Sequence, residues 1–267
     1  MEEFTQFKEQ MQQTFGLDLN SYKENQLRRR LTGYLARLNL PGYPALFARL
    51  KSSRQAYEAF LEYLTINVSE FFRDPARWTE LEKEILPALL AGKPGGLKIW
   101  SAACAGGAEP YSLAIILKEL APRRPHRLLA TDLDQSILEQ ARQGRYHPDA
   151  VRYVSKERLD KFFERSGSSF AVKEELKKMV VFRRHDLLTE PFEEGWDLIV
   201  CRNVSIYFTR AAQDQLNGKL TKSLAGGGFL FIGGSEMIFN YKELGLERVR
   251  ASFYRKTAGS RGPASRG

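Results

Sequence analysis

Cysteine and histidine are scarce in this sequence. Cys104 and Cys201 are the only cysteines in 267 residues, and the three histidines are far apart in the chain. These numbers indicate neither a disulfide framework nor a metal site built from cysteine and histidine. No apolar run reaches the length needed to span a membrane. We therefore expect a cytoplasmic protein with no bound metal and no direct insertion into a membrane.

The common phosphate-binding turns are absent as well. The chain contains neither G-x-x-x-x-G-K-[ST] nor G-x-G-x-x-G, whose backbone amides hold nucleotide phosphates. It does contain an apolar run from Leu97 to Ala102, then small residues with Gly106 and Gly107, then a helical pattern from Leu113. Small residues let a ligand approach the backbone closely. This strand–turn–helix stretch predicts a site for a nucleoside without a phosphate tail, although an ordinary tight turn would look similar.

Acidic residues are fewer than basic ones. The sequence has 41 lysines and arginines against 32 aspartates and glutamates, which gives a formal net charge of +9. Such a charge favours acidic partners, namely nucleic acid, an anionic membrane or an acidic protein, and does not choose among them.

The pattern of apolar residues divides the chain into regions. Residues 1–90 are predicted to be a helical domain, within which Leu64 to Pro75 is a non-repetitive segment with neither a helical nor a strand period. Residues 97–256 alternate between predicted strands and helices, which is typical of a mainly parallel sheet. Residues 145–179 interrupt this alternation, and we interpret them as a small inserted subdomain. Residues 257–267 are rich in glycine, serine, proline and arginine, and we expect them to be disordered.

Two further helices are predicted inside these regions. Residues Arg77 to Leu90 are predicted to form one helix, and Ser155 to Arg165 another. Ser166 to Ser169 is predicted to be a turn, followed by a short strand at Phe170 to Val172.

Four predicted strands end at Ala103, Asp132, Asp186 and Asn203. The carboxyl ends of parallel strands meet at the edge where α/β sheets bind ligands. The carboxylate of Asp132 follows the second strand, where it could accept hydrogen bonds from both ribose hydroxyls. The alternative role of Asp132 is to cap the next helix, which suits Asp134 better. This arrangement without a phosphate site fits S-adenosylmethionine (SAM).

The D/N-P-P-Y motif of one class of amine methyltransferases is missing, and Arg202 to Phe208 occupies its place. Its absence excludes that class alone. A nucleic-acid methyltransferase of another class and a non-catalytic, cofactor-binding signalling module both remain possible at this point.

Four stretches resemble one known family, the chemoreceptor glutamate O-methyltransferases of the CheR type. They follow a basic helical region in the right order: Asn67-Val68-Ser69-Glu70-Phe71-Phe72-Arg73, Glu109-Pro110-Tyr111-Ser112, Ala130-Thr131-Asp132-Leu133-Asp134 and Cys201-Arg202-Asn203-Val204-Ser205-Ile206-Tyr207-Phe208. The resemblance covers nearly all of residues 1–256. It implies a class I SAM-dependent methyltransferase fold, an α/β fold with a mainly parallel, doubly wound sheet, an all-α N-terminal domain and a small inserted β-subdomain. It also implies that the enzyme makes glutamyl methyl esters on receptors for sensory adaptation.

The resemblance implies a set of site residues. The cofactor is SAM, with S-adenosylhomocysteine as product, and its ligands would be Asn67, Ser69, Arg73, Ala103, Glu109, Asp132, Asp186, Leu187, Asn203 and Val204. Arg73 and Tyr207 are the candidate catalytic residues. Simpler roles are a helix cap for Asn67, a salt bridge from Arg73 to Asp74 or Glu70, and a core position for Tyr207. Three departures from the family pattern, Ser69, Ala108 and Gly234, remove no evident cofactor ligand.

The substrate-binding candidates Lys23, Arg30 and Arg37 recur every seven residues and so share one face of a predicted helix. A solvated surface is the simpler interpretation. The resemblance places Arg30 on a helix that faces the receptor, whose cytoplasmic helical bundle is acidic. We therefore expect a monomer that binds this bundle and no nucleic acid, and we expect Arg30→Ala to leave thermal stability almost unchanged. The turn at Arg165 to Phe170 is short, so we expect no binding of a receptor C-terminal pentapeptide.

Overall fold

The computed structural model describes residues 2–65 and 67–257. Four helices form the N-terminal body: α1 (Glu2–Phe15), α2 (Glu24–Arg37), α3 (Tyr43–Ser52) and α4 (Arg54–Leu64). Phe4, Phe7 and Met11 lie on one face of α1 and pack with Leu31 and Phe60 in a separate core. The helical pattern of this region is therefore confirmed.

The next helical segment belongs to the other body. It consists of α5 (Pro75–Glu80), a π-helical turn η1 (Leu81–Ile85) and α6 (Leu86–Gly92), which follow one another without a gap. The helix predicted for Arg77 to Leu90 is therefore confirmed, with a π-helical turn in its middle. Trp78, Leu81 and Leu86 pack in the core of the sheet. The apolar side of an amphipathic helix does not indicate which core it joins. For this reason we propose to divide the chain near residue 66, not at residue 90.

A seven-stranded sheet organises the larger body, in the order β6-β2-β1-β7-β8-β10-β9. Its strands are β1 (Lys98–Ala102), β2 (Arg127–Asp132), β6 (Val180–Arg184), β7 (Trp196–Cys201), β8 (Leu224–Ile232), β9 (Leu246–Arg250) and β10 (Phe253–Lys256). The five strands from β6 to β8 are parallel to their neighbours, whereas β10 pairs antiparallel with both β8 and β9. This is the expected mainly parallel sheet.

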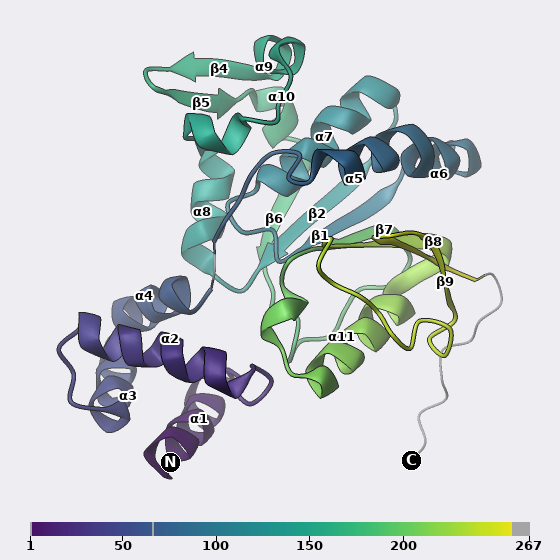
Figure 1. Cartoon of the computed structure of the whole chain (residues 1–267). Helices are drawn as coiled ribbons and strands as arrows, with labels where there is room; N and C mark the ends of the chain where they lie inside the picture. Colours follow the sequence, from purple (N-terminus) through teal and green to yellow (C-terminus); the bar gives the residue numbers. More distant parts are fainter. Residues whose placement is uncertain (1, 66, 258–267) are drawn as a thin grey trace.

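Helices cover both faces of this sheet (Figure 1). The helices that cover the sheet are α5 and α6 together with α7 (Ala108–Leu120), α8 (Gln135–Gln143) and α11 (Arg210–Ser223). Side chains alternate along β1, so that Ile99 packs with α7 on one face and Trp100 packs with α11 on the other. The sheet is therefore doubly wound, and the carboxyl ends of its central strands meet at one edge.

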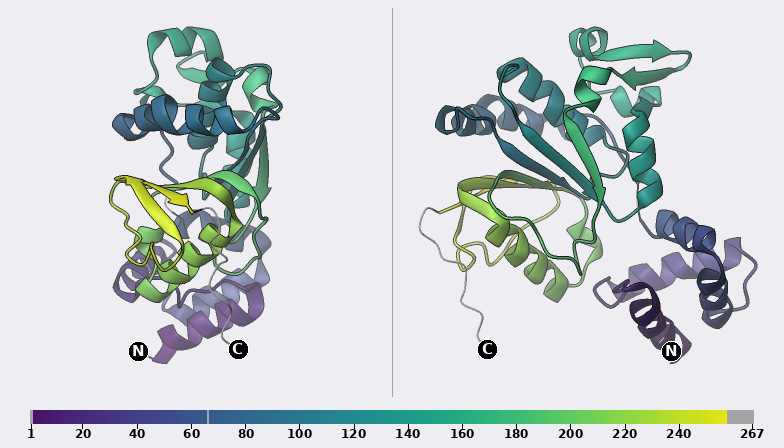
Figure 2. Two further views of the ribbon diagram at one scale, coloured as in Figure 1. Left: turned by 90° about the vertical axis from the view of Figure 1, so that its right-hand side faces the viewer. Right: turned by 180° about the vertical axis from the view of Figure 1, so that it is seen from behind.

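The inserted subdomain is a three-stranded antiparallel sheet in the order β3-β5-β4. Its elements are β3 (Arg145–Tyr146), the 3-10 turn η2 (Pro148–Val151), α9 (Lys156–Phe162), β4 (Phe163–Ser166), β5 (Ser169–Val172) and α10 (Glu174–Lys177). The helix predicted to reach Arg165 ends at Phe162, because the residues that follow pair with β5. In Figure 2 the subdomain and the N-terminal helices lie at opposite ends of the molecule.

The C-terminal end of the described chain is held in place by Thr257, whose backbone N–H donates to the carbonyl of Gly245 over 3.0 Å. The rest of the predicted disordered tail, residues 258–267, lies outside the described residues. Across residues 2–65 and 67–257, no helix has the length and apolar character needed to cross a membrane.

Candidate active site

A cavity of about 510 Å³ lies where the carboxyl edge of the sheet faces the N-terminal body. The sheet contributes Ala103, Ala105, Asp132, Asp186 and Asn203, and the N-terminal body contributes Gln26, Arg29, Arg30, Tyr63 and Thr65. The size suits a small organic ligand. Two bodies with separate cores thus share the walls of one site.

Most of the predicted site residues line this cavity: Arg30, Asn67, Arg73, Ala103, Asp132, Asp186, Leu187, Asn203, Val204 and Tyr207. Ser69, Glu109, Lys23 and Arg37 are not among the lining residues. The contacts predicted for these four residues stay predictions, and the structure shows other uses for three of them.

Asp132 ends β2 with its carboxylate pointing at the neighbouring turn. One oxygen accepts the backbone N–H of Ala105 over 2.8 Å, and the other accepts that of Asp134 over 3.1 Å. Only 6% of Asp132 is exposed. Burial raises the pKa of this carboxyl, and the two N–H donors oppose the shift. The helix cap is Asp134, whose side chain accepts from Ser136 and Ile137, so the alternative role of Asp132 as a cap is wrong.

The segment from Asn67 to Arg73 crosses the turn between β1 and α7. Asn67 donates from Nδ2 to the carboxylate of Asp134 over 3.1 Å. This contact differs from the helix cap that was the simpler role for Asn67. The hydroxyl of Ser69 accepts the backbone N–H of Ala108 over 3.0 Å and so caps the first turn of α7. A hydroxyl at position 69 therefore has a structural use in addition to its predicted contact with the cofactor.

The salt bridges considered for Arg73 are made by other residues. Asp74 pairs with Arg202 at 2.6 Å, and Glu70 pairs with Arg152 at 2.8 Å. Within the described parts of the chain, no side chain holds the guanidinium of Arg73, which lines the cavity. The simpler role of Arg73, a salt bridge to Asp74 or Glu70, is therefore wrong.

Arg202 is a cavity residue that our sequence analysis did not single out. Its side chain is 3% exposed and donates to the Arg73 carbonyl over 2.9 Å as well as to Asp74. The carboxylate of Glu109 lies 3.6 Å away on the other side. Burial raises the pKa of Glu109, and Arg202 acts against that rise. The signal in the sequence was that Arg202 belongs to the stretch from Cys201 to Phe208 that resembles the family.

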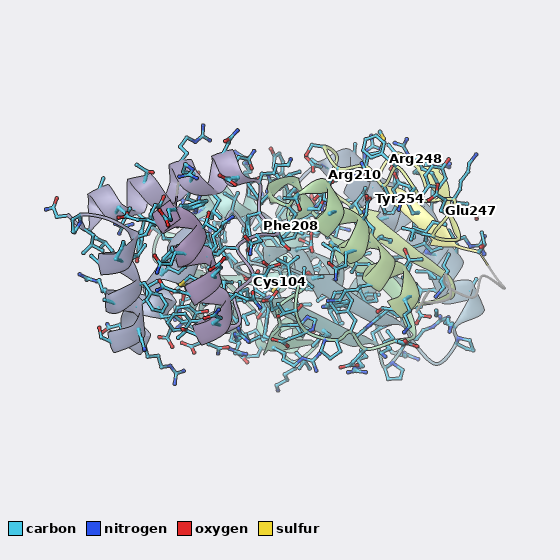
Figure 3. All side chains as sticks on the ribbon, turned by 90° about the horizontal axis from the view of Figure 1, so that it is seen from below. Cys104, Phe208, Arg210, Glu247, Arg248 and Tyr254 are labelled. Carbon is cyan, nitrogen blue, oxygen red and sulfur yellow. The ribbon has the colours of Figure 1, made fainter. Side chains whose placement is uncertain are left out.

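Backbone contacts fasten the N-terminal body to the loop after β7. Tyr22 and Phe208 form an isolated antiparallel bridge, and Phe208 lies between the N-terminal helices and α11 in Figure 3. The backbone N–H of Lys23 donates to the Tyr207 carbonyl over 2.9 Å, and its ammonium donates to the Ile206 carbonyl over 2.8 Å. Lys23 thus connects the two bodies.

Arg30 makes hydrogen bonds within the N-terminal body that the charged stretch of sequence around it did not indicate. Its guanidinium donates to the carbonyls of Tyr63 and Thr65 at the end of α4, with Nη2 2.8 Å from the Thr65 oxygen. It also lies over the Tyr63 ring. These contacts show that Arg30 is not a free surface charge. We therefore replace the expectation of almost unchanged stability by the prediction that Arg30→Ala destabilises the protein, because these carbonyls would lose a charged donor.

Comparisons with known proteins agree with this geometry. Residues 67–252 match the family described as CheR methyltransferase, SAM binding domain, and residues 2–65 match CheR methyltransferase, all-alpha domain. The chain is 41% identical to a chemotaxis protein methyltransferase of Listeria monocytogenes over 255 residues, which are 96% of this chain and 97% of that protein.

More distant likenesses were also found. A chemotaxis protein methyltransferase of Borreliella burgdorferi is 32% identical over 255 residues, covering 91% of this chain and 89% of that protein. Among solved structures, an O-methyltransferase family 2 protein from Planctomyces limnophilus is similar with a TM-score of 0.34 and 19% identity, over 52% of this chain and 32% of that one.

Proposed function

The chain belongs to the CheR methyltransferase family and is a SAM-dependent chemotaxis methyltransferase. We propose that it forms glutamyl methyl esters on chemoreceptors, and that the transfer takes place in the cavity described above. The observation that supports this location is the shared wall. Strand ends that suit a nucleoside and residues of the basic helix α2 line the same space. A cofactor on the sheet and a receptor side chain arriving along α2 would therefore meet there.

The residues present fit SAM. The carboxylate of Asp132 uses its two oxygens for backbone donors on one side and still has lone pairs for ribose hydroxyls on the cavity side. Asn67 and Asn203 offer amides, and no basic side chain follows the glycine turn as a phosphate would require. A Cβ added to Gly106 would lie 3.4 Å from the Cβ of Ser69, in ordinary van der Waals contact, so the crossing segment packs directly on the turn.

Each group has a proposed role in binding the cofactor. We assign Asp132 to the ribose and Asp186, Leu187, Asn203 and Val204 to the adenosine end. Asn67, Ser69, Arg73, Ala103 and Glu109 are the remaining proposed ligands. SAM, when bound, supplies an electrophilic methyl group on its sulfonium. The protein residues then need only to align a nucleophile with it.

The nucleophile, a glutamate carboxylate of the receptor, is already ionised at neutral pH, so no general base is required. We propose that the guanidinium of Arg73 holds this carboxylate through two parallel hydrogen bonds. The phenol of Tyr207, which lines the same cavity, would donate a further hydrogen bond. Both contacts fix the direction of attack and exclude water from the carboxylate.

We further propose that the enzyme works as a monomer in the cytoplasm, on the acidic helical bundle of the receptor, and does not act on nucleic acid. Two observations support this setting. Cys104 and Cys201 are buried and unpaired, as is usual in a reducing compartment. The exposed basic residues of α2, such as Arg29 and Arg37, suit an acidic protein surface.

The test is a methylation assay with SAM carrying a labelled methyl group. Receptor cytoplasmic fragments should acquire label that base releases as methanol, whereas RNA should acquire none. Arg73→Ala should lower turnover at saturating SAM by at least roughly tenfold, the loss of about 1.4 kcal/mol of alignment. Arg54→Ala, which removes an arginine side chain that is 88% exposed, is the matched control.

Three results would contradict the proposal. Label that resists base would mean that the product is not a carboxyl ester. Label in RNA would indicate a nucleic-acid methyltransferase. SAM binding without transfer to any receptor fragment would indicate a non-catalytic signalling module.

A further inference from the structure

A second carboxylate, that of Glu236, lies behind the cavity wall. It follows β8 in the turn Gly233–Glu236, and the residue is 9% exposed. Oε2 accepts the backbone N–H groups of Gly233 over 2.7 Å and Asn203 over 2.8 Å. Oε1 accepts the N–H groups of Val204 and Ser205 over 3.2 and 2.9 Å, and the Ser205 hydroxyl over 2.7 Å. One side chain thus collects five donors, four of them from the backbone.

These donors converge because of an unusual backbone. Asn203 has φ +60°, in the left-handed region, and Val204 follows with φ −116° and ψ −43°. Successive residues of this kind turn their N–H groups toward one point and form a nest for an anion. Here the anion is a side chain of the protein itself. Left-handed backbone is unfavourable for a residue other than glycine, so the nest requires its carboxylate.

Gly233, in the same turn, provides the space that the carboxylate of Glu236 occupies. A Cβ added to Gly233 would lie 2.7 Å from Oε2 of Glu236 and 2.8 Å from Nδ2 of Asn203. Both distances are too short for a real contact. The glycine therefore allows the carboxylate and the loop after β7 to approach each other.

We propose that Glu236 is a positioning residue for the nucleoside wall of the cavity. It touches neither cofactor nor substrate, because Glu236 is not among the lining residues, whereas Asn203 and Val204 are. It holds Asn203 in the left-handed conformation and so sets where that amide and Val204 face the cavity. The inference rests on the proposed function, since it assumes that this wall receives the adenosine end of SAM.

The role predicts a specific defect in Glu236→Gln. The glutamine amide has nearly the same size, but its NH₂ group would oppose some of the N–H donors that the carboxylate accepts. The loop would relax and the cavity wall would shift. The turn at Asp132 is held by separate bonds and would stay in place. We therefore expect a higher KM for SAM, with turnover at saturating SAM changed far less.

The experiment measures S-adenosylhomocysteine binding to the full chain by titration calorimetry. We expect Glu236→Gln to weaken the affinity at least roughly tenfold, as when a charge-assisted hydrogen bond is lost. Glu243→Gln, an exposed carboxylate in the same segment, should leave the affinity unchanged. Ser205→Ala removes one of the five donors and should weaken binding by a smaller factor, roughly two- to fivefold.

A double-mutant cycle distinguishes positioning from general loss of structure. In the Asn203→Ala background, Glu236→Gln should have little further effect on affinity, because the two residues act on the same contact. An equal effect of Glu236→Gln in both backgrounds would overturn the proposal, and so would an affinity equal to that of the unmodified protein. If Glu236→Gln does not fold, an unchanged affinity in Ser205→Ala would overturn it instead.

Failure of this inference can be told apart from failure of the proposed function. Binding is measured without any receptor, so an enzyme that binds S-adenosylhomocysteine but does not methylate receptor fragments would contradict only the proposed function. Equal dissociation constants for Glu236→Gln and the unmodified protein would contradict only the role of Glu236.

Discussion

Arg30→Ala should destabilise the protein, and the size of the effect follows from its contacts. The guanidinium donates to the carbonyls of Tyr63 and Thr65. These carbonyls lie at the C-terminal end of α4, where the last carbonyls of a helix have no partner within the helix. A cation at this end also interacts favourably with the helix dipole. Arg30 therefore joins α2 to the end of α4.

The expected loss is smaller than the sum of the separate hydrogen bonds. A hydrogen bond to a charged group contributes about 1.5–3 kcal/mol. Tyr63 and Thr65 both line the cavity. Water could therefore replace part of what the guanidinium provides, and we take ~1–2 kcal/mol for the whole substitution. For a domain of roughly 150–250 residues, each kcal/mol corresponds to a shift of about 2–4 °C in Tm. We therefore expect Tm to fall by roughly 2–8 °C.

Thermal unfolding followed by circular dichroism is the measurement. Arg30→Lys keeps the charge but loses the fork of donors, so it should recover only part of the stability. Arg29→Ala, the exposed neighbour on the same helix, controls for the loss of one positive charge. A Tm for Arg30→Ala equal to those of Arg29→Ala and the unmodified protein would refute the argument and restore the interpretation of Arg30 as a solvated charge.

Four further outcomes are expected. Asp132→Ala should weaken SAM binding more than tenfold, about the value of a charge-assisted hydrogen bond of 1.5–3 kcal/mol; unchanged affinity by calorimetry would contradict the ribose assignment. Arg37→Glu should slow receptor methylation at low salt and much less at high salt, where surface charges are screened; a salt-independent rate would argue against docking through α2. Burial lowers the pKa values of His126 and His185 below 6.5, so near this pH the unfolded chain binds more protons than the folded protein. The free energy of unfolding should therefore fall as the pH decreases below about 6.5. Urea titrations should show a smaller fall for His126→Gln than for the unmodified protein, and an equal fall would contradict the argument. The short turn at residues 165–170 predicts no pentapeptide binding, and a micromolar dissociation constant in a fluorescence titration would contradict it.

The strand ends at the site could be predicted from the sequence alone. Ala103, Asp132, Asp186 and Asn203 each follow a short apolar run, and all four line the cavity. Parallel strands bring their carboxyl ends together whatever the rest of the chain does. The sequence pattern was sufficient here because the relevant contacts are set by topology.

Contacts between distant segments could not be predicted in the same way. The hydroxyl of Ser69 caps a helix that begins at Ala108, and the guanidinium of Arg30 binds carbonyls at the end of α4. Both partners are backbone groups, which every residue carries, so side-chain chemistry gives no signal for them. The core that α5 and α6 join could not be predicted for a different reason: their apolar side chains pack with the sheet, and the apolar side of a helix does not indicate its partner.

The residues with left-handed backbone at the site show what keeps the cavity in shape. Besides Asn203, the cavity residues Ala103 and Ala105 and the nearby Asp74 have positive φ. Three of these four contact a buried charged side chain: Asp132 binds the N–H of Ala105, Arg202 binds the carboxylate of Asp74, and Glu236 binds the N–H of Asn203. Such conformations cost on the order of 1–3 kcal/mol each and persist only where the surroundings hold them. The three charges therefore act first on the geometry of the cavity, so replacing any of them should impair cofactor binding before it unfolds the sheet.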